Sequence, residues 1–249
     1  MWIKNSIREE IQNLFSASKD ISNKTIEKSK LNNLPEPVRK YFKYSLHPQN
    51  SNISYVRLKH GGKFRLNDKW MDIEGQEYFT IQDPGFIWLG NVPLFLAKDQ
   101  YFKGKGSLEV RLFSLIRIID ERGGEMNKSE MLRWLGEAPW YPTALLPSKV
   151  ISWENDTKTS AKVIMKHQGL KAEGIFYFDK EGQPVRFSAK RNKDGRLEDW
   201  TGHYHDYKKV DGMMIPFHVD VEWNLEEQDY TYADFTIQEI EYNKPNVYE

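Results

Sequence analysis

Three histidines and one aspartate are the residues whose types and spacing best suit chemistry in this sequence. They lie on two segments of alternating polarity. Two imidazoles and a carboxylate that converge from neighbouring strands can bind a metal ion or share a proton. The four candidates for a metal site are His203, His205, His218 and Asp220. A metal-assisted hydrolase that uses this cluster is therefore one functional hypothesis.

The dipeptide Asp211-Gly212 predicts how these residues pair. Both positions of a two-residue hairpin loop need a positive φ, and this dipeptide favours such loops. With that loop His205 faces His218, and His203 faces Asp220, while the other side of the hairpin pairs Trp200 with Trp223. Opposed side chains have Cβ atoms about 5 Å apart. A metal or proton-transfer site and ordinary cross-strand contacts on a solvent-facing surface both fit this arrangement.

A second candidate site is the proline-rich segment 137–147, which follows an expected helix. Its prolines restrict the backbone, so the segment should be stiff and extended and present Trp140 and Tyr141 at low entropic cost. Arg133 and Glu137 are four residues apart on one helix face, where an ion pair can form. The segment can be the rim or lid of a ligand cavity, or a helix-to-strand crossover that plugs one end of a sheet.

Composition excludes several classes of function. Lys plus Arg equals Asp plus Glu, 36 against 36, so no overall positive field attracts nucleic acid. There is no cysteine, which excludes disulfides and zinc sites built on sulfur. Because the glycine-rich stretches lack the spacing of a phosphate loop, we expect no cofactor. No apolar stretch is long enough for a membrane helix, and charges interrupt residues 1–30, so we expect a cytoplasmic chain without a transmembrane segment.

Periodicity predicts the elements that must position these residues. Apolar residues at helical spacing, from Ile3 to Phe15, predict an amphipathic helix that docks on the domain or on a partner, and residues 1–33 are expected to be this helix and a linker. A short second helix should follow Leu34. From about residue 53 the period becomes two, which predicts a single β-rich domain over 34–249. The expected fold is mainly β (α+β), a large curved antiparallel sheet or half-barrel with a few helices packed on it.

Two local expectations concern turns and caps. The Gly61-Gly62 pair is expected to supply a hairpin turn, with a return strand that begins at Phe64. Asn127 and Glu130 have the spacing of a capping box for a helix that carries Trp134 and ends before Pro139.

The chain resembles an uncharacterised bacterial family, a domain of unknown function. The central motif that carries the resemblance is Leu-Gly-Glu-Ala-Pro-Trp-Tyr-Pro-Thr-Ala-Leu-Leu-Pro at 135–147. Further matching stretches are 34–41, 62–65, 200–202, 215–216 and Trp223. The resemblance implies membership but no reaction or catalytic residue. In architecture the chain more distantly resembles the half-barrels of lipoprotein-carrier and related lipid-binding proteins.

The leading functional hypothesis is a binding module that holds an apolar or amphipathic small molecule against the aromatic-rich concave side of the sheet. Aromatic residues make up 14% of the chain, including eight tryptophans, although aliphatic side chains alone could build a core. The expected ligand-binding residues are Arg133, Glu137, Trp140, Tyr141, Trp200 and Trp223. The alternatives are the hydrolase above and a protein-interaction domain that docks through its N-terminal helix. Oligomeric state and enzymatic activity stay open.

Overall fold

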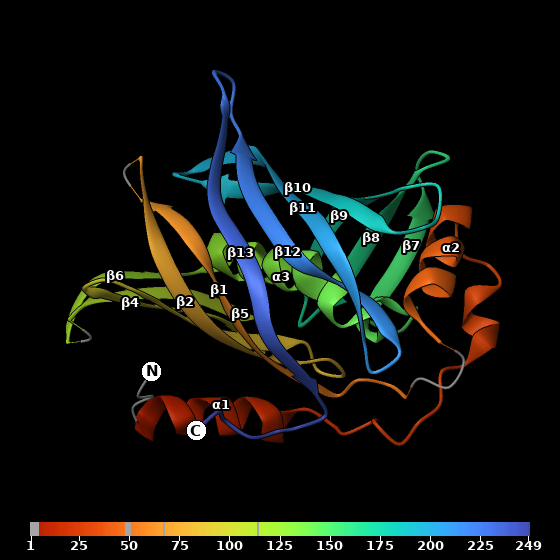
Figure 1. Cartoon of the computed structure of the whole chain (residues 1–249), viewed down its shortest axis with the longest axis horizontal. Helices are drawn as coiled ribbons and strands as arrows, with labels where there is room; N and C mark the ends of the chain where they lie inside the picture. Colours follow the sequence, from red (N-terminus) through yellow and green to blue (C-terminus); the bar gives the residue numbers. More distant parts are fainter. Residues whose placement is uncertain (1–4, 48–50, 67, 114) are drawn as a thin grey trace.

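The computed structural model describes residues 5–47, 51–66, 68–113 and 115–249, and it has one curved antiparallel sheet of 13 strands. The strand order is β6-β5-β4-β3-β2-β1-β13-β12-β11-β10-β9-β8-β7, so nearly every strand pairs with its neighbour in the chain. The sheet curls around helix α3 without closing (Figure 1). This half-barrel confirms the expected fold class.

The strands are β1 (Tyr55–Leu66), β2 (Lys69–Thr80), β3 (Gly85–Val92), β4 (Phe95–Phe102), β5 (Lys105–Leu112), β6 (Ile116–Arg122), β7 (Ile151–Asn155), β8 (Ser160–His167), β9 (Leu170–Phe178), β10 (Pro184–Lys193), β11 (Arg196–Val210), β12 (Met213–Asn224) and β13 (Asp229–Tyr242). The helices are α1 (Asn5–Ala17), α2 (Glu36–Ser45) and α3 (Gly124–Glu137), with short 3₁₀ helices η1 (Lys28–Leu31), η2 (Ala138–Trp140) and η3 (Pro142–Leu145). None of the helices in the described ranges is long and apolar enough to cross a membrane.

Alternation along the strands decides which side of the sheet is buried. In β12 one row of apolar residues, which includes Ile215 and Val219, faces the core, and the intervening His218 and Asp220 face outward. A buried aliphatic side chain contributes roughly 1.5–3 kcal/mol, so such a row fixes the face of its strand. The concave face therefore carries the main core, where α3 packs on β4, β5, β9 and β10.

Strand order explains why the middle of segment 123–150 is buried. This segment joins β6 to β7, which are the two edge strands of the sheet. The chain therefore crosses the concave side between them as α3, η2 and η3. Trp140 and Tyr141 keep only 4% and 0% of their surface exposed. The segment is a crossover that plugs the half-barrel, and its prolines start two 3₁₀ turns instead of an extended stretch.

Helices α1 and α2 pack on the sheet as separate elements. The apolar face of α1 buries Ile11, Leu14 and Phe15 in a second cluster with Tyr78 and Tyr248. Phe15 meets Tyr78 edge to face, with ring centroids 6.1 Å apart. The expected helix is thus confirmed over the described part, while Ile3 lies outside the described residues. The apolar face of α1 docks on this chain's own sheet.

The Gly61-Gly62 pair is not a turn, so that prediction was wrong. β1 runs through both glycines to Leu66, and its pairing with β13 shifts by one residue between Lys59 and His60. Gly62 has φ 141°, and a Cβ there would lie 2.0 Å from the carbonyl oxygen of Asp234. Gly62 therefore allows the backbones of β1 and β13 to approach closely beside a bulge. Close backbone approach is a common reason for glycine within a strand.

The capping box predicted for α3 was also wrong. The N-cap is Gly123, with φ 118°, and no side chain caps it. Asn127 instead accepts a hydrogen bond from the backbone N–H of Gly106 through its Oδ1, at 2.8 Å. Its side chain ties the first turn of α3 to β5. The helix ends at Glu137, before Pro139, as expected.

Two hairpin turns meet at one end of the half-barrel, which we call the closed end. A Cβ on Gly104, in the β4–β5 turn, would lie 2.7 Å from the Cβ of Gln168 in the β8–β9 turn. Nearby, Tyr101 and His167 share a hydrogen bond of 2.9 Å, and the other ring nitrogen of His167 lies 2.9 Å from Asp83. These contacts join the two halves of the sheet behind α3.

Candidate functional site

The concave face holds a cluster of buried charges, and Arg133 of α3 is at its centre. Arg133 donates hydrogen bonds to three carboxylates, each on a different side of the guanidinium. Its Nε reaches Glu137 at 2.8 Å, Nη1 reaches Asp99 at 2.7 Å, and Nη2 reaches Glu77 at 3.1 Å. The ion pair that four-residue spacing predicted with Glu137 is therefore present. Phe86 and Trp88 lie under the same guanidinium, at 5.0 and 4.8 Å.

A second arginine, Arg191 of β10, extends the cluster. Its Nη2 donates to Glu130 at 3.1 Å, and its guanidinium lies 4.7 Å from the ring of Trp200 and 6.0 Å from that of Trp223. Trp200 in turn donates from its indole nitrogen to the hydroxyl of Tyr232 at 2.9 Å. The structure thus brings four predicted ligand-binding residues into one region of the concave face. They are Arg133, Glu137, Trp200 and Trp223.

Four carboxyl groups and two arginines make up the charges of this cluster, so two carboxyl groups must be neutral for the charges to balance. Burial raises the pKa of Glu77 well above its usual range, and the adjacent Glu137 raises it further. Burial also raises the pKa of Glu130, with a contribution from Asp99. Glu77 neighbours Glu137, whose pKa burial also raises, and Glu130 neighbours Asp99, so one proton in each pair relieves the repulsion between the two carboxyl groups. The cluster is then electrically neutral.

His60 of β1 forms the deepest polar part of this region. Its Nε2 accepts a hydrogen bond from the indole of Trp88 at 2.8 Å, and its ring stacks on Phe235 at 4.3 Å between centroids. Burial, with the positive charge of Arg133, lowers the pKa of His60 to about 3. The imidazole is therefore neutral at physiological pH and serves as an acceptor within the aromatic wall.

Trp140 and Tyr141 lie apart from the charged cluster, in the aromatic core beneath it. The Tyr141 ring packs 4.7 Å from Phe79, and its hydroxyl donates to the Trp134 carbonyl at 2.7 Å. The Trp140 carbonyl accepts from Tyr242 at 2.7 Å. Both residues hold the crossover in place. A direct role for them in ligand binding stays a prediction.

The histidine candidates lie on the outer face, in the predicted register. His205 pairs with His218, and His203 with Asp220, across the two-residue loop at Asp211-Gly212. Each imidazole contacts a different carboxylate. The contacts are His203 with Glu222 at 3.1 Å, His205 with Asp220 at 2.7 Å, and His218 with Asp234 at 3.1 Å. We call these three contacts the outer ladder.

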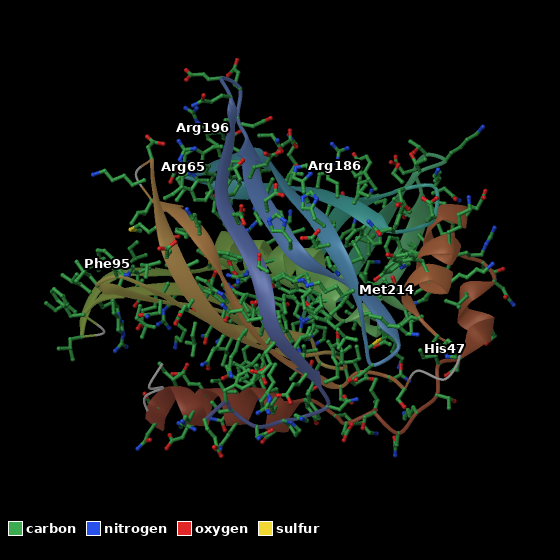
Figure 2. The ribbon with its side chains drawn as sticks, viewed as in Figure 1. His47, Arg65, Phe95, Arg186, Arg196 and Met214 are labelled. Atoms are coloured by element: carbon green, nitrogen blue, oxygen red, sulfur yellow. The ribbon has the colours of Figure 1, made fainter. Side chains whose placement is uncertain are left out.

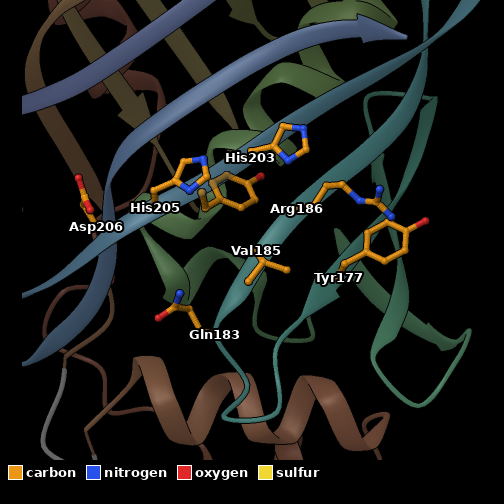
Figure 3. Close-up of a pocket in the computed structure, with 8 residues that line it drawn as sticks. Tyr177, Gln183, Val185, Arg186, His203, His205 and Asp206 are labelled. Atoms are coloured by element: carbon orange, nitrogen blue, oxygen red, sulfur yellow. The ribbon is translucent and has the colours of Figure 1, made fainter. Parts of the chain in front are cut away.

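Within the described ranges, no group of three or more His, Asp or Glu side chains is placed to hold a metal ion. The outer ladder is accordingly a row of separate pairs. It borders an open hollow of about 700 Å³ on the outer face of β9, β10 and β11 (Figure 3). In this hollow the guanidinium of Arg186 lies 3.8 Å above the ring of Tyr177, beside His203 and His205. This surface offers a shallow polar contact area rather than an enclosed reaction site.

Sequence reasoning missed five residues of the cluster, although each carries a readable signal. Each is a charged or titratable residue at a position whose spacing along its strand or helix makes it face inward. Apolar residues normally occupy such positions. Glu77, for example, shares its parity on β2 with Ile73 and Phe79, and Arg191 shares its parity on β10 with Phe187 and Ala189. A charge in such a row must find a partner across the interior. The missed residues are His60, Glu77, Asp99, Glu130 and Arg191.

Sheet and cluster together define an antiparallel half-barrel protein with a charged interior. By sequence, the chain belongs to the family described as "Family of unknown function (DUF6544)", whose model matches residues 24–235. This confirms the expected membership in a family of unknown function. No curated protein matches the chain.

Two solved structures are similar to this chain. One is a DUF1329 family protein from Desulfovibrio piger, with a TM-score of 0.45 and 10% identity, covering 95% of this chain and 93% of that one. The other is a LolA superfamily protein from Nitrosomonas europaea, with a TM-score of 0.45 and 11% identity, covering 84% of this chain and 92% of that one.

Proposed function

We propose that this protein binds an amphipathic small molecule on the concave face, between the charged cluster and the side of the half-barrel opposite the closed end. We call that side the open end. It is where the hairpins β1–β2, β3–β4 and β10–β11 terminate, and Figure 2 labels Arg65, Phe95 and Arg196 there. The observation that carries the proposal is an aromatic wall that leads from the cluster toward this end.

The aromatic wall is only partly covered by the rest of the chain. Phe64, Trp223 and Tyr232 are half-buried residues that pack against the main core. The rings of Trp223 and Tyr232 stack at 6.2 Å, and Phe64 meets Tyr232 edge to face at 5.9 Å. Large aromatic side chains arranged in this way provide apolar contact area for an alkyl chain or ring.

Apolar side chains continue to the open end across β3, β4 and β5. Val92 and Ala97 are half-buried and pack against the core from the strands that face the aromatic wall. The large hydrophobic residues that are exposed within the described ranges lie at hairpin ends or on edge strand β6. They are Leu66, Trp70, Leu94, Phe113, Leu115, Ile116, Ile118, Ile119 and Leu197.

The aromatic wall and the apolar residues of β3 and β4 provide apolar surface, and the charged cluster lies at its inner end. This arrangement suits a molecule that has both an apolar and a polar part. The outer ladder gives less support to a hydrolase, because each of its imidazoles is paired separately on an open surface. The interaction-domain alternative is weakened because α1 already buries its apolar face against this chain.

Quenching of tryptophan fluorescence by C16 amphiphiles, supported by native mass spectrometry, tests the proposal. We expect a saturable one-to-one complex with at least one of hexadecanoate, hexadecanol and hexadecyltrimethylammonium, each kept below its micellar concentration. Trp223→Ala should weaken binding about tenfold, because it removes a large aromatic contact from the wall. Trp70→Ala is the matched control, since Trp70 is 43% exposed on the opposite face of β2. If none of the three amphiphiles binds, the proposal is wrong.

A further inference from the structure

The two arginines of the concave cluster differ in how completely their donors are used. Every nitrogen of the Arg133 guanidinium has a partner, because Nε, Nη1 and Nη2 each donate to a different carboxylate. Arg191 donates through Nη2 to Glu130, while its buried Nε has no hydrogen-bond partner. A buried guanidinium with a spare donor is costly unless something else accepts from it. Arg133 is therefore held by partners within the chain, whereas Arg191 has a donor that a ligand can use.

The surroundings of Arg191 are those of a ligand contact. The residue is 9% exposed, so more than nine-tenths of it is buried, and it lies where β10 approaches the open end. Its guanidinium contacts Trp200 and Trp223, so the aromatic wall begins at this residue. A planar guanidinium held against aromatic rings is pre-organised to bind a carboxylate through two parallel hydrogen bonds.

We propose that Arg191 binds the acidic headgroup of a single-chain amphipathic ligand, a long-chain carboxylate, whose chain lies along Trp223 and Tyr232. This inference rests on the proposed function and adds the chemical class of the ligand. The ligand carboxylate accepts from the guanidinium edge that includes Nε, and the Nη2 contact with Glu130 is kept.

Electrostatics at this position favour an anion. The carboxyl group that contacts Arg191 is that of Glu130, and burial raises its pKa well above the usual range. A raised pKa leaves Glu130 with less negative charge than an exposed glutamate, so it compensates the positive charge of Arg191 less completely. By contrast, Arg133 already has Asp99 and Glu137 beside it. An incoming carboxylate therefore gains a charge-assisted hydrogen bond at Arg191.

The headgroup preference of the unmodified protein is the first test. Dissociation constants for hexadecanoate, hexadecanol and hexadecyltrimethylammonium are measured at pH 8 by tryptophan fluorescence. We expect hexadecanoate to bind at least about tenfold more tightly than either of the others. Equal affinities, or a preference for the cation, would overturn the role of Arg191 while leaving the proposed function intact. Absence of any binding removes both proposals.

A pair of variants on one strand gives the second test. Arg191→Gln should abolish the preference for the carboxylate while the affinity for hexadecanol stays within about twofold. Lys190→Gln removes the same charge from the next residue, which is exposed and paired with Asp199 at 2.8 Å, and should keep the preference. An Arg191→Gln protein that still selects hexadecanoate contradicts the inference. If this variant does not fold, the headgroup series on the unmodified protein decides.

Discussion

The concave cluster and the outer ladder both pair basic side chains with carboxyl groups, on opposite faces of one sheet. In the outer ladder His203, His205 and His218 keep 29–47% of their side-chain surface exposed, and each meets one carboxylate. In the concave cluster Arg133 is 13% exposed and contacts three carboxylates that are 1–16% exposed. The two groups differ in the basic residue, arginine inside and histidine outside, and above all in burial.

Burial changes what these groups can do. A surface ion pair is largely screened by water and contributes about 0–1 kcal/mol, so the outer ladder tolerates change. Buried carboxyl groups lose water and must find a cation or keep a proton, which explains the raised pKa values of Glu77 and Glu130. We therefore expect the interior to be sensitive to both substitution and pH, and the exterior to tolerate substitution.

Removing the central cation should have the largest effect on stability. Arg133→Met leaves Glu77, Asp99 and Glu137 without their common partner, so we expect a loss of about 3–5 kcal/mol in the free energy of unfolding at pH 7. Urea denaturation measures it. The control is Arg117→Met, because the Arg117 side chain is 48% exposed. A loss below about 1 kcal/mol in Arg133→Met would contradict the central role of this residue.

The two buried protons predict an alkaline loss of stability, which is the next largest effect. Because the native pKa values of Glu77 and Glu130 are raised, their stabilising contribution is complete below the unfolded value of about 4.3. It is lost as the pH rises through the raised values, by up to about 1.4 kcal/mol per pH unit for each proton.

The double variant Glu77→Gln/Glu130→Gln should flatten this slope, because an amide carries no titrating proton. Urea denaturation between about pH 5 and about pH 9 measures the slope. Glu173→Gln is the control, since Glu173 is an exposed residue whose lowered pKa comes chiefly from a hydrogen bond with Lys171. An unchanged slope in the double variant would show that the protons reside elsewhere.

The outer ladder should give the smallest effect. His203→Ala and His205→Ala are each expected to change the free energy of unfolding by less than about 1 kcal/mol, because both contacts are partly exposed to water. Thermal unfolding with and without Zn²⁺ tests the metal hypothesis in the same samples. A rise in melting temperature with Zn²⁺ in the unmodified protein, lost in both variants, would restore a metal site at these histidines.

Local sequence signals predicted those parts of the fold that depend on neighbouring residues. The hairpin at Asp211-Gly212 fixed the register of β11 and β12, and the alternation around Ile215 fixed their faces. Four-residue spacing predicted the pair Arg133 and Glu137. The same signals failed at Gly61-Gly62, because the reason for glycine there is the carbonyl of Asp234, more than 170 residues away in the chain.

By itself, the sequence determined a half-barrel of alternating strands with His203, His205 and His218 outside and Trp200 and Trp223 inside, because period-two patterning forces one face of each strand out of water. Only the tertiary structure decided that Arg133 also meets Glu77 of β2 and Asp99 of β4, and that Arg191 meets Glu130 of α3. These partners are brought together by the curl of the sheet around the crossover. Their charge balance depends on distances across the interior, which no local pattern encodes.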